Sequence, residues 1–324
     1  MRFPAALAAI LFLAGCAKAP NSALLTAPNA FGKDFWETWS DGHAEISTYE
    51  LVIPRYGEPR QGESILIFVP ETHLEATRVK NENPRPRPGD VFSAMKVIWQ
   101  RNFQTGIYDY SEMLTAFLGL APSGRRQPGE LSALMFSRQE WCGQSFTKAV
   151  FHPQEIRVSG ASYFEGESDL SQTLETKPEA VSEDGLALWA RQMSGPWLKP
   201  GETKAVPFLT GLRSARDAHT RLAYSQINLT RLATLTNIEV PAGEFLAETW
   251  AAQLPNGRSY LFYVEQEAPH RLLRWQFTSG EKGELVATER LKYWEMTGLD
   301  DHEELRRLGL EPRAPRFLLD LDVP

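Results

Sequence analysis

The sequence predicts a mainly β fold of the β-rich α+β class, with a curved antiparallel sheet or incomplete β-barrel and a few peripheral helices. Apolar residues recur with a period of two through most of the chain, as in Tyr49, Leu51 and Ile53, which is typical of strands with one buried face. Turns rich in Gly, Pro and Asn separate these segments. Strands and helices do not alternate as in βαβ units, which argues against a Rossmann-type fold.

A short helix is expected first, over residues 30–39, because four aromatic residues recur there at helical spacing. These are Phe31, Phe35, Trp36 and Trp39, and Asp41-Gly42 supplies a stop signal. Core packing explains the stripe, and a platform for a stacked ligand is the alternative.

Strands follow from residue 44 to residue 164. The segments with strand patterns are 44–53, 64–69, 91–99, 106–117, 131–136, 146–151 and 155–164. Pro54 and Gly57 form a turn after the first of them, and the proline-rich stretch 84–89 is expected to be an exposed loop.

One helix interrupts the strands in the second half. Leu186, Trp189, Ala190 and Met193 lie at helical spacing before Gly195-Pro196. The period of two then returns over 246–254 and 260–264, around the hairpin signal Pro255-Asn256-Gly257. Further strands are expected over 273–277 and 285–293, and a short helix over 300–308 before Gly309.

The N-terminus resembles a bacterial lipoprotein signal. Arg2 precedes an apolar stretch over 3–14, too short to span a bilayer, and Leu13-Ala14-Gly15-Cys16 follows. The resemblance implies that residues 1–15 are removed and that Cys16 carries a covalent diacylglycerol and an N-acyl chain. Ala17 after the cysteine implies sorting to the outer membrane, with the protein facing the periplasm.

The chain then divides into a signal over 1–15, the lipidated cysteine with a flexible tether over 16–30, and a β-rich periplasmic domain over 31–324. Within that domain the pattern allows two sub-sheets that meet near 165–200. No later apolar run is long enough to cross a membrane, so the lipid is the expected membrane attachment.

Charge and cysteine content exclude several classes of protein. The net charge is −7, and loss of Arg2 with the signal makes it −8, which argues against a nucleic-acid partner. Cys16 and Cys142 are the two cysteines. With Cys16 lipidated, neither an intramolecular disulfide nor a thiolate metal cluster is expected.

A cysteine hydrolase is one possible chemistry for this chain. Cys142 precedes His152 by ten residues, and a nucleophilic cysteine needs such a base together with an orienting acid. Asp109 or Glu140 could be that acid. The alternative interpretation is that Cys142 is a small buried apolar residue.

Metal and cofactor signals are missing from the sequence. The six histidines include no His-x-His or His-x-x-x-His pair, so neither a metal nor a cofactor is expected beyond the lipid at Cys16. The acidic stretch 300–304 is interpreted as the start of a helix, where the dipole favours negative charge.

Aromatic residues provide the candidates for ligand binding. Tyr108 and Tyr110 flank Asp109 on the opposite strand face, an arrangement that suits sugar recognition, although buried tyrosines give the same pattern. Trp99, Trp250 and Trp275 are expected on the inner face of the sheet. There they contact a ligand or pack in the core.

Two resemblances extend over parts of the chain. The motif at 240–245 (VPAGEF), with Tyr263-Val264 and Ala268-Pro269, resembles DUF3108-like periplasmic β-proteins over roughly residues 220–295. Such folds are similar to the LolA/LolB half-barrels, which hold lipid acyl chains on a curved sheet. The segments 35–42, 108–110, 139–143 and 291–295 resemble uncharacterised bacterial lipoproteins.

Some of those lipoproteins carry the label septum formation inhibitor Maf. Ser123-Gly124-Arg125-Arg126 lacks the proline of the pyrophosphatase motif, so that activity is not expected here.

The sequence therefore predicts a membrane-anchored, non-catalytic periplasmic protein that binds an apolar or amphiphilic envelope ligand. One alternative is the envelope hydrolase using Cys142 and His152. Another is a structural or assembly lipoprotein whose acidic face meets an envelope protein. The expected partners are the membrane, through the lipid, and a lipid, a glycan or an envelope protein.

Overall fold

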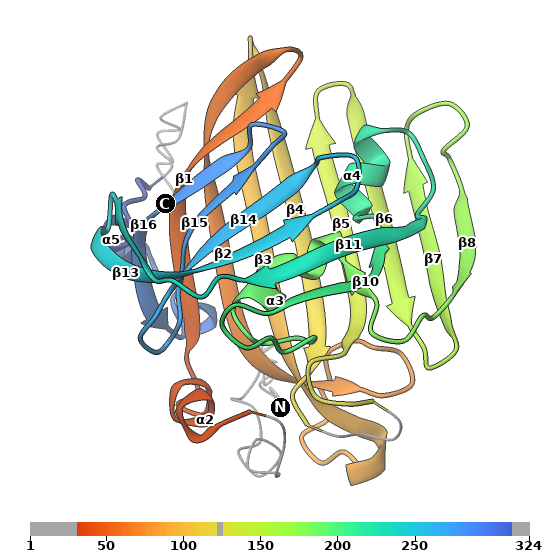
Figure 1. The fold of residues 1–324 in the computed structure, drawn as a ribbon, viewed down its shortest axis with the longest axis horizontal. Coiled ribbons are helices and arrows are strands. Elements are labelled where there is room, and N and C mark those ends of the chain that lie inside the picture. Colours follow the sequence, from red (N-terminus) through yellow and green to blue (C-terminus); the bar gives the residue numbers. More distant parts are fainter. Residues whose placement is uncertain (1–30, 122–125, 313–324) are drawn as a thin grey trace, which may run out of the picture.

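The computed structural model describes residues 31–121 and 126–312, in which sixteen strands form one sheet (Figure 1). The strands are β1 (Ala44–Arg55), β2 (Glu58–Leu74), β3 (Val91–Thr105), β4 (Tyr108–Gly119), β5 (Leu131–Glu140), β6 (Gly143–Phe151), β7 (Glu155–Ser162), β8 (Leu170–Glu175), β9 (Val181–Ser182), β10 (Thr203–Leu209), β11 (Tyr224–Arg231), β12 (Thr236–Val240), β13 (Gly243–Gln253), β14 (Ser259–Glu265), β15 (Leu272–Phe277) and β16 (Lys282–Leu291).

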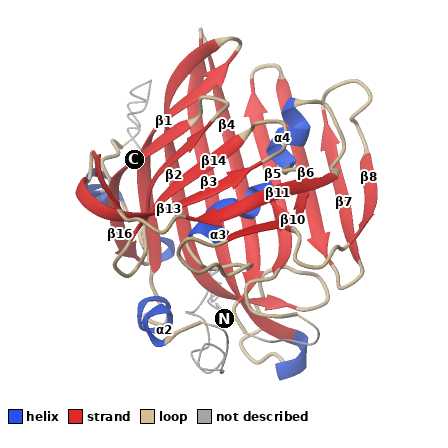
Figure 2. Ribbon diagram, in the orientation of Figure 1, coloured by secondary structure: helices blue, strands red, loops and turns tan. Residues whose placement is uncertain are grey.

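The helices are short and lie between or beside the strands (Figure 2). They are α2 (Lys33–Trp39), α3 (Leu186–Ala190), α4 (Leu212–Asp217) and α5 (His302–Arg307), with 3₁₀ turns η1 (Pro88–Asp90), η2 (Glu183–Gly185), η3 (Tyr293–Glu295) and η4 (Leu299–Asp301).

The sheet is built from two antiparallel meanders. The first runs from β1 to β8 in chain order, and the second leads back through β10, β11, β13, β14 and β15 to β16. Pairing of β1 with β16 joins the meanders. The two-residue β9 pairs parallel with β10 at the far end of the ladder, and β12 pairs with β13 outside the main path.

The ladder curves so that its two ends approach each other. Figure 1 shows β10 and β11 crossing in front of the first meander. The side-chain amide of Gln172, on β8, exchanges hydrogen bonds with the backbone of Leu222, just before β11, and Arg221 donates to the carbonyl of Ser171. These side-chain bonds bring the ends together without closing the barrel. The predicted fold class is therefore confirmed.

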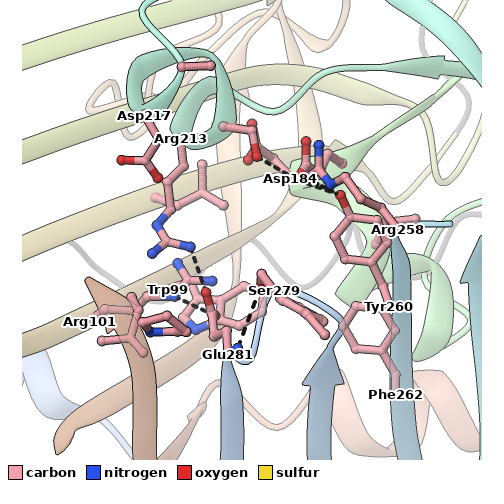
Figure 3. A pocket seen from close by; sticks show the side chains of 18 residues that line it. Trp99, Arg101, Asp184, Arg213, Asp217, Arg258, Tyr260, Phe262, Ser279 and Glu281 are labelled. Carbon is pink, nitrogen blue, oxygen red and sulfur yellow. Dashed lines mark hydrogen bonds and ion pairs between the residues drawn. The ribbon is translucent and has the colours of Figure 1, made fainter. Parts of the chain in front are cut away.

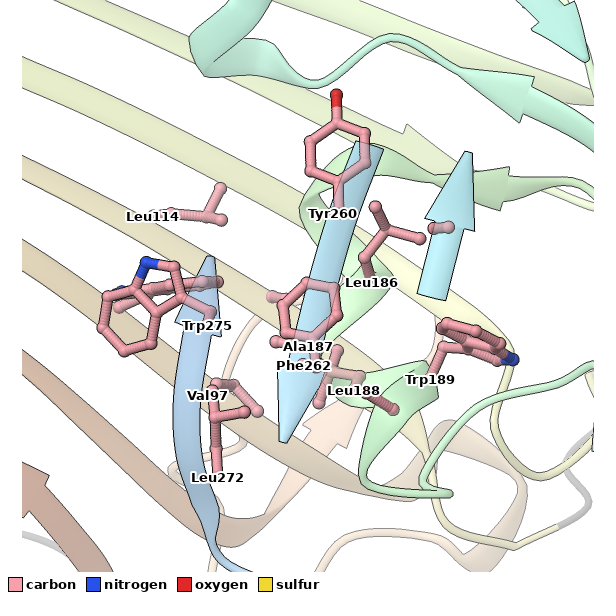
Figure 4. Close-up of a cluster of buried hydrophobic side chains, with 14 of the residues drawn as sticks. Val97, Leu114, Leu186, Ala187, Leu188, Trp189, Tyr260, Phe262, Leu272 and Trp275 are labelled. Carbon is pink, nitrogen blue, oxygen red and sulfur yellow. The ribbon is translucent and has the colours of Figure 1, made fainter. Parts of the chain in front are cut away.

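The passage from one meander to the other fills the interior. Residues 165–200, where the sequence allows a boundary between two sub-sheets, take the chain from β8, at one end of the ladder, past β9 at the other. All five residues of α3 are buried, and Figure 4 shows four of them, from Leu186 to Trp189, among the side chains of the core. The ring of Trp189 packs edge-on against that of Trp250, with 5.1 Å between the ring centroids. The helix thus occupies space that would otherwise be a large cavity.

A fully buried ion pair fixes the end of α3. The Arg191 guanidinium donates to both carboxylate oxygens of Glu45, on β1, at 2.6 and 3.1 Å. It also donates to the backbone carbonyls of Pro269 and His270. Because a buried charge is costly without such partners, these bonds hold α3 against β1 and the β14–β15 connection.

The structure confirms most of the predicted elements, including the hairpin over 246–264, which forms β13 and β14. The predicted helix over 186–193 is real but shorter, with a 3₁₀ turn before it. Six strands and helices have no counterpart in the prediction, namely β8, β9, β10, α4, β11 and β12. They are short, from two to eight residues, so local alternation alone did not indicate them.

Candidate ligand-binding cavity

A cavity of about 440 Å³ lies between the two meanders, beside α4 (Figure 3). Strands β1, β3, β4, β14 and β15 contribute to its wall together with η2, α3, α4 and the turn before β16. The apolar and aromatic lining residues are Ile53, Pro54, Trp99, Leu114, Leu186, Ala218, Phe262 and Phe277. The polar ones are Arg101, Glu183, Asp184, Arg213, Ser214, Asp217, Arg258, Tyr260, Ser279 and Glu281.

The strand pleat explains why charged residues reach the interior. Trp99, Arg101 and Phe103 alternate along β3 and are all buried, so Arg101 lies on the inward face with two aromatic neighbours. Glu112 is likewise buried on β4 between Tyr110 and Leu114. Both charges are therefore placed in the core by the same alternation that buries the apolar residues.

These charges form one alternating series of ion pairs. The series runs Arg101, Glu281, Arg213, Glu112, Arg138, Asp217 and Arg55, with N···O distances of 2.6–3.2 Å. It contains four arginines and three carboxylates. Low local dielectric strengthens each pair, and the series crosslinks β3, β4, β5 and the turn before β16 with α4.

Two carboxylates of the series, Glu112 and Glu281, have lowered pKa values in the folded protein. Burial disfavours the Glu112 carboxylate, but Arg213 and Arg138 outweigh burial and hold its pKa at about 2. Burial likewise opposes ionisation of Glu281, and Arg101 and Arg213 lower its pKa. Opposite charges at this range favour the charged form of an acid.

A second carboxylate pair holds α4 in place. Glu183 accepts from the backbone N–H of Gly211 at 2.9 Å and from the hydroxyl of Ser214 at 2.6 Å. Asp184 accepts from the N–H of Leu212 at 2.7 Å. The first N–H groups of a helix lack partners within it, so η2 caps α4 from another part of the chain.

Asp184 has a strongly perturbed acidity. It is half-buried at the cavity wall, and burial raises the pKa of its carboxyl group to about 7. Repulsion from Glu183 raises the pKa further, while the hydrogen bond from Leu212 and the charges of Arg101 and Arg213 lower it. Raised acid pKa values in a cavity are a recognised mark of functional sites. Here the same group also caps a helix.

At the outer end of the ion-pair series, tyrosines replace carboxylates. The hydroxyl of Tyr56 lies 2.7 Å from that of Tyr110 and 3.1 Å from that of Tyr108. The Arg55 guanidinium donates to Tyr110 and stacks on the ring of Tyr56. Tyr110 is buried and stacks on Phe103 at 4.8 Å. The tyrosines of the predicted 108–110 motif thus belong to the rim of the interior, while Asp109 faces out and is exposed.

The candidate catalytic residues are not brought together. Cys142 is exposed in the turn before β6, whereas His152 follows the other end of that strand. A strand rises about 3.3 Å per residue, which places the two residues roughly 30 Å apart. Glu140 is opposite Tyr110 at the same rim as Cys142. Cys142 and His152 therefore cannot act as nucleophile and base, because a proton transfer needs direct contact.

The three candidate tryptophans are all buried, but only Trp99 lines the cavity. Its Nε1 donates to Ser64, and its ring lies edge-on to that of Trp275 at 5.0 Å. Trp275 donates to Glu281 at 3.2 Å and so supports the ion-pair series from behind. Trp250 packs with Trp189 in the core.

Other predicted features are placed as follows. Cys16 and the lipoprotein signal lie outside the described residues. Among the described residues, no group of three or more His, Cys, Asp or Glu side chains could hold a metal ion. The acidic stretch 300–304 spans η4 and the start of α5. In the same part of the chain, no helix is long and apolar enough to cross a membrane.

Apart from Trp99, the residues that line the cavity were not predicted from the sequence. A usable signal existed for Arg101 and Glu112, since each occupies an inward position of an alternating strand. No local sequence pattern indicated Arg213 or Asp184. The elements that hold them, α4 and η2, lie beside the cavity only because of the way the chain passes from one meander to the other.

Comparisons with known proteins identify no family. No protein-family model matches the chain, and no curated protein matches it. Among solved structures, it is similar to a β-barrel-like protein of a domain of unknown function, DUF1849, from Brucella abortus. The TM-score is 0.43 with 8% sequence identity, and the match covers 77% of this chain and 98% of that one.

Proposed function

We propose that this protein is a non-catalytic binding protein that takes a small amphiphilic ligand into the cavity beside α4. The main support is that apolar and charged side chains line the same cavity. Trp99, Leu114 and Phe262 share it with the buried charged residues Arg101 and Glu281. Its volume of about 440 Å³ lies within the range of small-molecule sites. The likeness of residues 220–295 to DUF3108-like periplasmic β-proteins supports a ligand of the same kind.

The occupied interior sets a limit on the size of the ligand. Because α3 and its tryptophan neighbours fill the centre of the half-barrel, the ligand is a compact amphiphile. A molecule with several long acyl chains does not fit. Binding would bury its apolar part against the rings and leave its polar part among the charged groups.

Blocking the cavity tests the proposal. Ser279 lines the cavity and is exposed, so Ser279→Trp should obstruct it without burying a polar group. We expect mass spectrometry to find a small amphiphile with the full-length chain and to find it depleted in Ser279→Trp. Gln226→Trp, on the exposed face of β11, is the control and should retain the ligand. Equal ligand content in the two variants would refute the proposed site.

We further infer that the protein is tethered to the outer membrane and faces the periplasm, on the support of the sequence around Cys16. Metabolic labelling with a radioactive fatty acid should mark the full-length chain and should fail to mark Cys16→Ala. Cys142→Ala is the matched control because it removes the other cysteine. Label retained in Cys16→Ala would contradict the tether.

A further inference from the structure

We propose that the cavity selects amphiphiles that carry one negative charge, a carboxylate in the simplest case, and that this charge pairs with Arg101. The inference rests on the proposed function, since it names the chemical class of the ligand at the same site. The supporting observation is that the buried ion-pair series ends at the cavity on an arginine, Arg101.

The series begins and ends on an arginine. Its four arginines and three carboxylates leave one positive charge in excess. At one end Arg55 is a quarter exposed and contacts the hydroxyl of Tyr110. At the other end Arg101 is buried and lines the cavity. The excess charge is thus more costly at the Arg101 end, because the Arg101 side chain is 5% exposed and that of Arg55 is 25% exposed.

Arg101 has one carboxylate partner. Its Nε donates to Oε1 of Glu281 at 3.1 Å, and that carboxylate is shared with Arg213 at 2.6 Å. The Arg101 guanidinium lies 4.0 Å above the ring of Trp99. An arginine fork offers two further terminal nitrogens, and a carboxylate matches that fork with two parallel hydrogen bonds.

The acidities of the two arginines agree with this geometry. Burial lowers the pKa of Arg101 and is stronger than the attraction of Glu281. Burial also acts on Arg213, but Glu112 and Glu281 together raise its pKa. The charge of Arg213 is therefore balanced by two carboxylates, whereas Arg101 shares a single carboxylate with Arg213.

The other acids around the cavity are already engaged. Glu183 accepts from Gly211, Ser214, Tyr260 and Arg258. Asp184 accepts from the N–H of Leu212 and forms no ion pair within 4 Å among the described residues. Neither forms an ion pair with Arg101, so an anion from outside would give the Arg101 guanidinium a second partner.

The neighbouring side chains indicate that this anion has an apolar body. Trp99, Leu114, Leu186 and Phe262 line the same cavity. A small inorganic anion would leave these surfaces uncovered, whereas an alkyl or aromatic carboxylate would bury them.

Three probes with one alkyl chain separate charge from apolar contact. Calorimetric titration of the purified full-length chain with decanoate, decanol and decyltrimethylammonium should give at least tenfold tighter binding for decanoate than for decanol. The cationic probe should bind least. Acetate should bind at least tenfold more weakly than decanoate, because it lacks the apolar body.

Arg101→Met should remove the preference. We expect decanoate binding to weaken at least tenfold and decanol binding to stay within twofold. This variant leaves three arginines and three carboxylates, so its network is balanced and should fold, as circular dichroism can verify. Arg101→Lys keeps the positive charge but lacks the two parallel donors of a guanidinium. Its affinity for decanoate should lie between that of the original chain and that of Arg101→Met. Arg157→Met, at an exposed arginine on β7, is the control and should bind all probes unchanged.

The possible failures are distinguishable. Equal binding of decanoate and decanol would overturn the charge selection and leave the proposed amphiphile site intact. Failure of all three alkyl probes to bind would overturn the proposed function and the inference with it. Undiminished decanoate binding by Arg101→Met would overturn the role of Arg101.

Discussion

At the scale of single residues, charges on inward-facing strand positions determine the character of the interior. Arg101 and Glu112 follow the same alternation as the apolar residues around them. Such buried charges are kept only when each has a partner. The folded state therefore depends on the ion-pair series as well as on the aromatic core. We expect the free energy of unfolding to vary with pH both near neutrality and in the acid range.

Above pH 5, Asp184 is expected to dominate that variation. Its pKa is about 7 in the folded protein and 3.8 as an unperturbed group, so the folded state holds the proton more tightly. Stability is then greatest below the unfolded value and falls as pH rises towards 7, by about 2 kcal/mol between pH 5 and pH 7. Asp184→Asn should remove this decline.

Urea denaturation at pH 5, 6, 7 and 8 measures the effect. The free energy of unfolding of the original chain should fall relative to that of Asp184→Asn as pH rises. Asp300→Asn, at an exposed position, should follow the original chain. Parallel curves for the original chain and Asp184→Asn would show that Asp184 is not a buried titrating group.

In the acid range, Glu112 and Glu281 act in the opposite direction. Their pKa values are lowered in the folded protein, to about 2 for Glu112, so their stabilisation is present above pH 4.5 and is lost as pH falls. Glu112→Gln should cost about 3 kcal/mol at pH 6 because it leaves Arg138 and Arg213 short of a partner. Glu303→Gln, which removes an exposed pair with Arg306, should cost less than about 1 kcal/mol. Chemical denaturation of both variants checks the difference, and equal costs would contradict it.

Cys142 is expected to behave as an ordinary exposed thiol. A colorimetric thiol reagent should label it completely without denaturant, because it lies in an exposed turn. Cys142→Ala and His152→Ala should each change the free energy of unfolding by less than about 1 kcal/mol and leave ligand binding in the cavity unaltered. Labelling that requires unfolding would contradict the exposed position.

At the scale of elements, close packing between neighbouring strands fixes the wall behind the cavity. Gly283, on β16, lies opposite Trp275 on β15, and the tryptophan ring covers the place where a side chain would start. Trp275 is fully buried between Tyr49 and Trp99. It therefore has no free space into which it could move.

Gly283→Ala should consequently destabilise the protein by about 3 kcal/mol or prevent folding, because the added methyl group overlaps a rigid ring. Gly89→Ala, where no atom lies within 4 Å of the added carbon, is the matched control and should be tolerated. Thermal unfolding followed by circular dichroism compares them. A Gly283→Ala variant as stable as Gly89→Ala would contradict this packing.

At the scale of the whole molecule, the sheet has a continuous middle and two open ends. Strands β2, β3 and β4 have neighbours on both sides over long stretches, whereas β8 has one paired edge and β9 has two residues. Amide protection follows such differences in local opening. The ends are joined by side-chain bonds from Gln172 and Arg221 rather than by a strand ladder.

Hydrogen exchange should therefore begin at β8 and be slowest in β2 to β4. Mass spectrometry of peptides from the exchanging chain resolves the order. Gln172→Ala should speed exchange in β8 and leave β3 unchanged. Protection in β8 equal to that in β3 would mean that the ends pair more extensively than the side-chain bonds allow.

The sequence by itself determined the mainly β character, most strands of the first meander and the hairpin of β13 and β14, because strand period and turn chemistry are local properties. It also placed Tyr108 and Tyr110 on one face. Only the tertiary structure decided that α3 fills the interior, that Cys142 and His152 lie apart, and that Arg101 comes close to Arg213 and Asp184. These arrangements depend on the long connection between the two meanders, which brings the second meander to lie over the first. Contacts between residues far apart in the sequence leave no local pattern that could be detected.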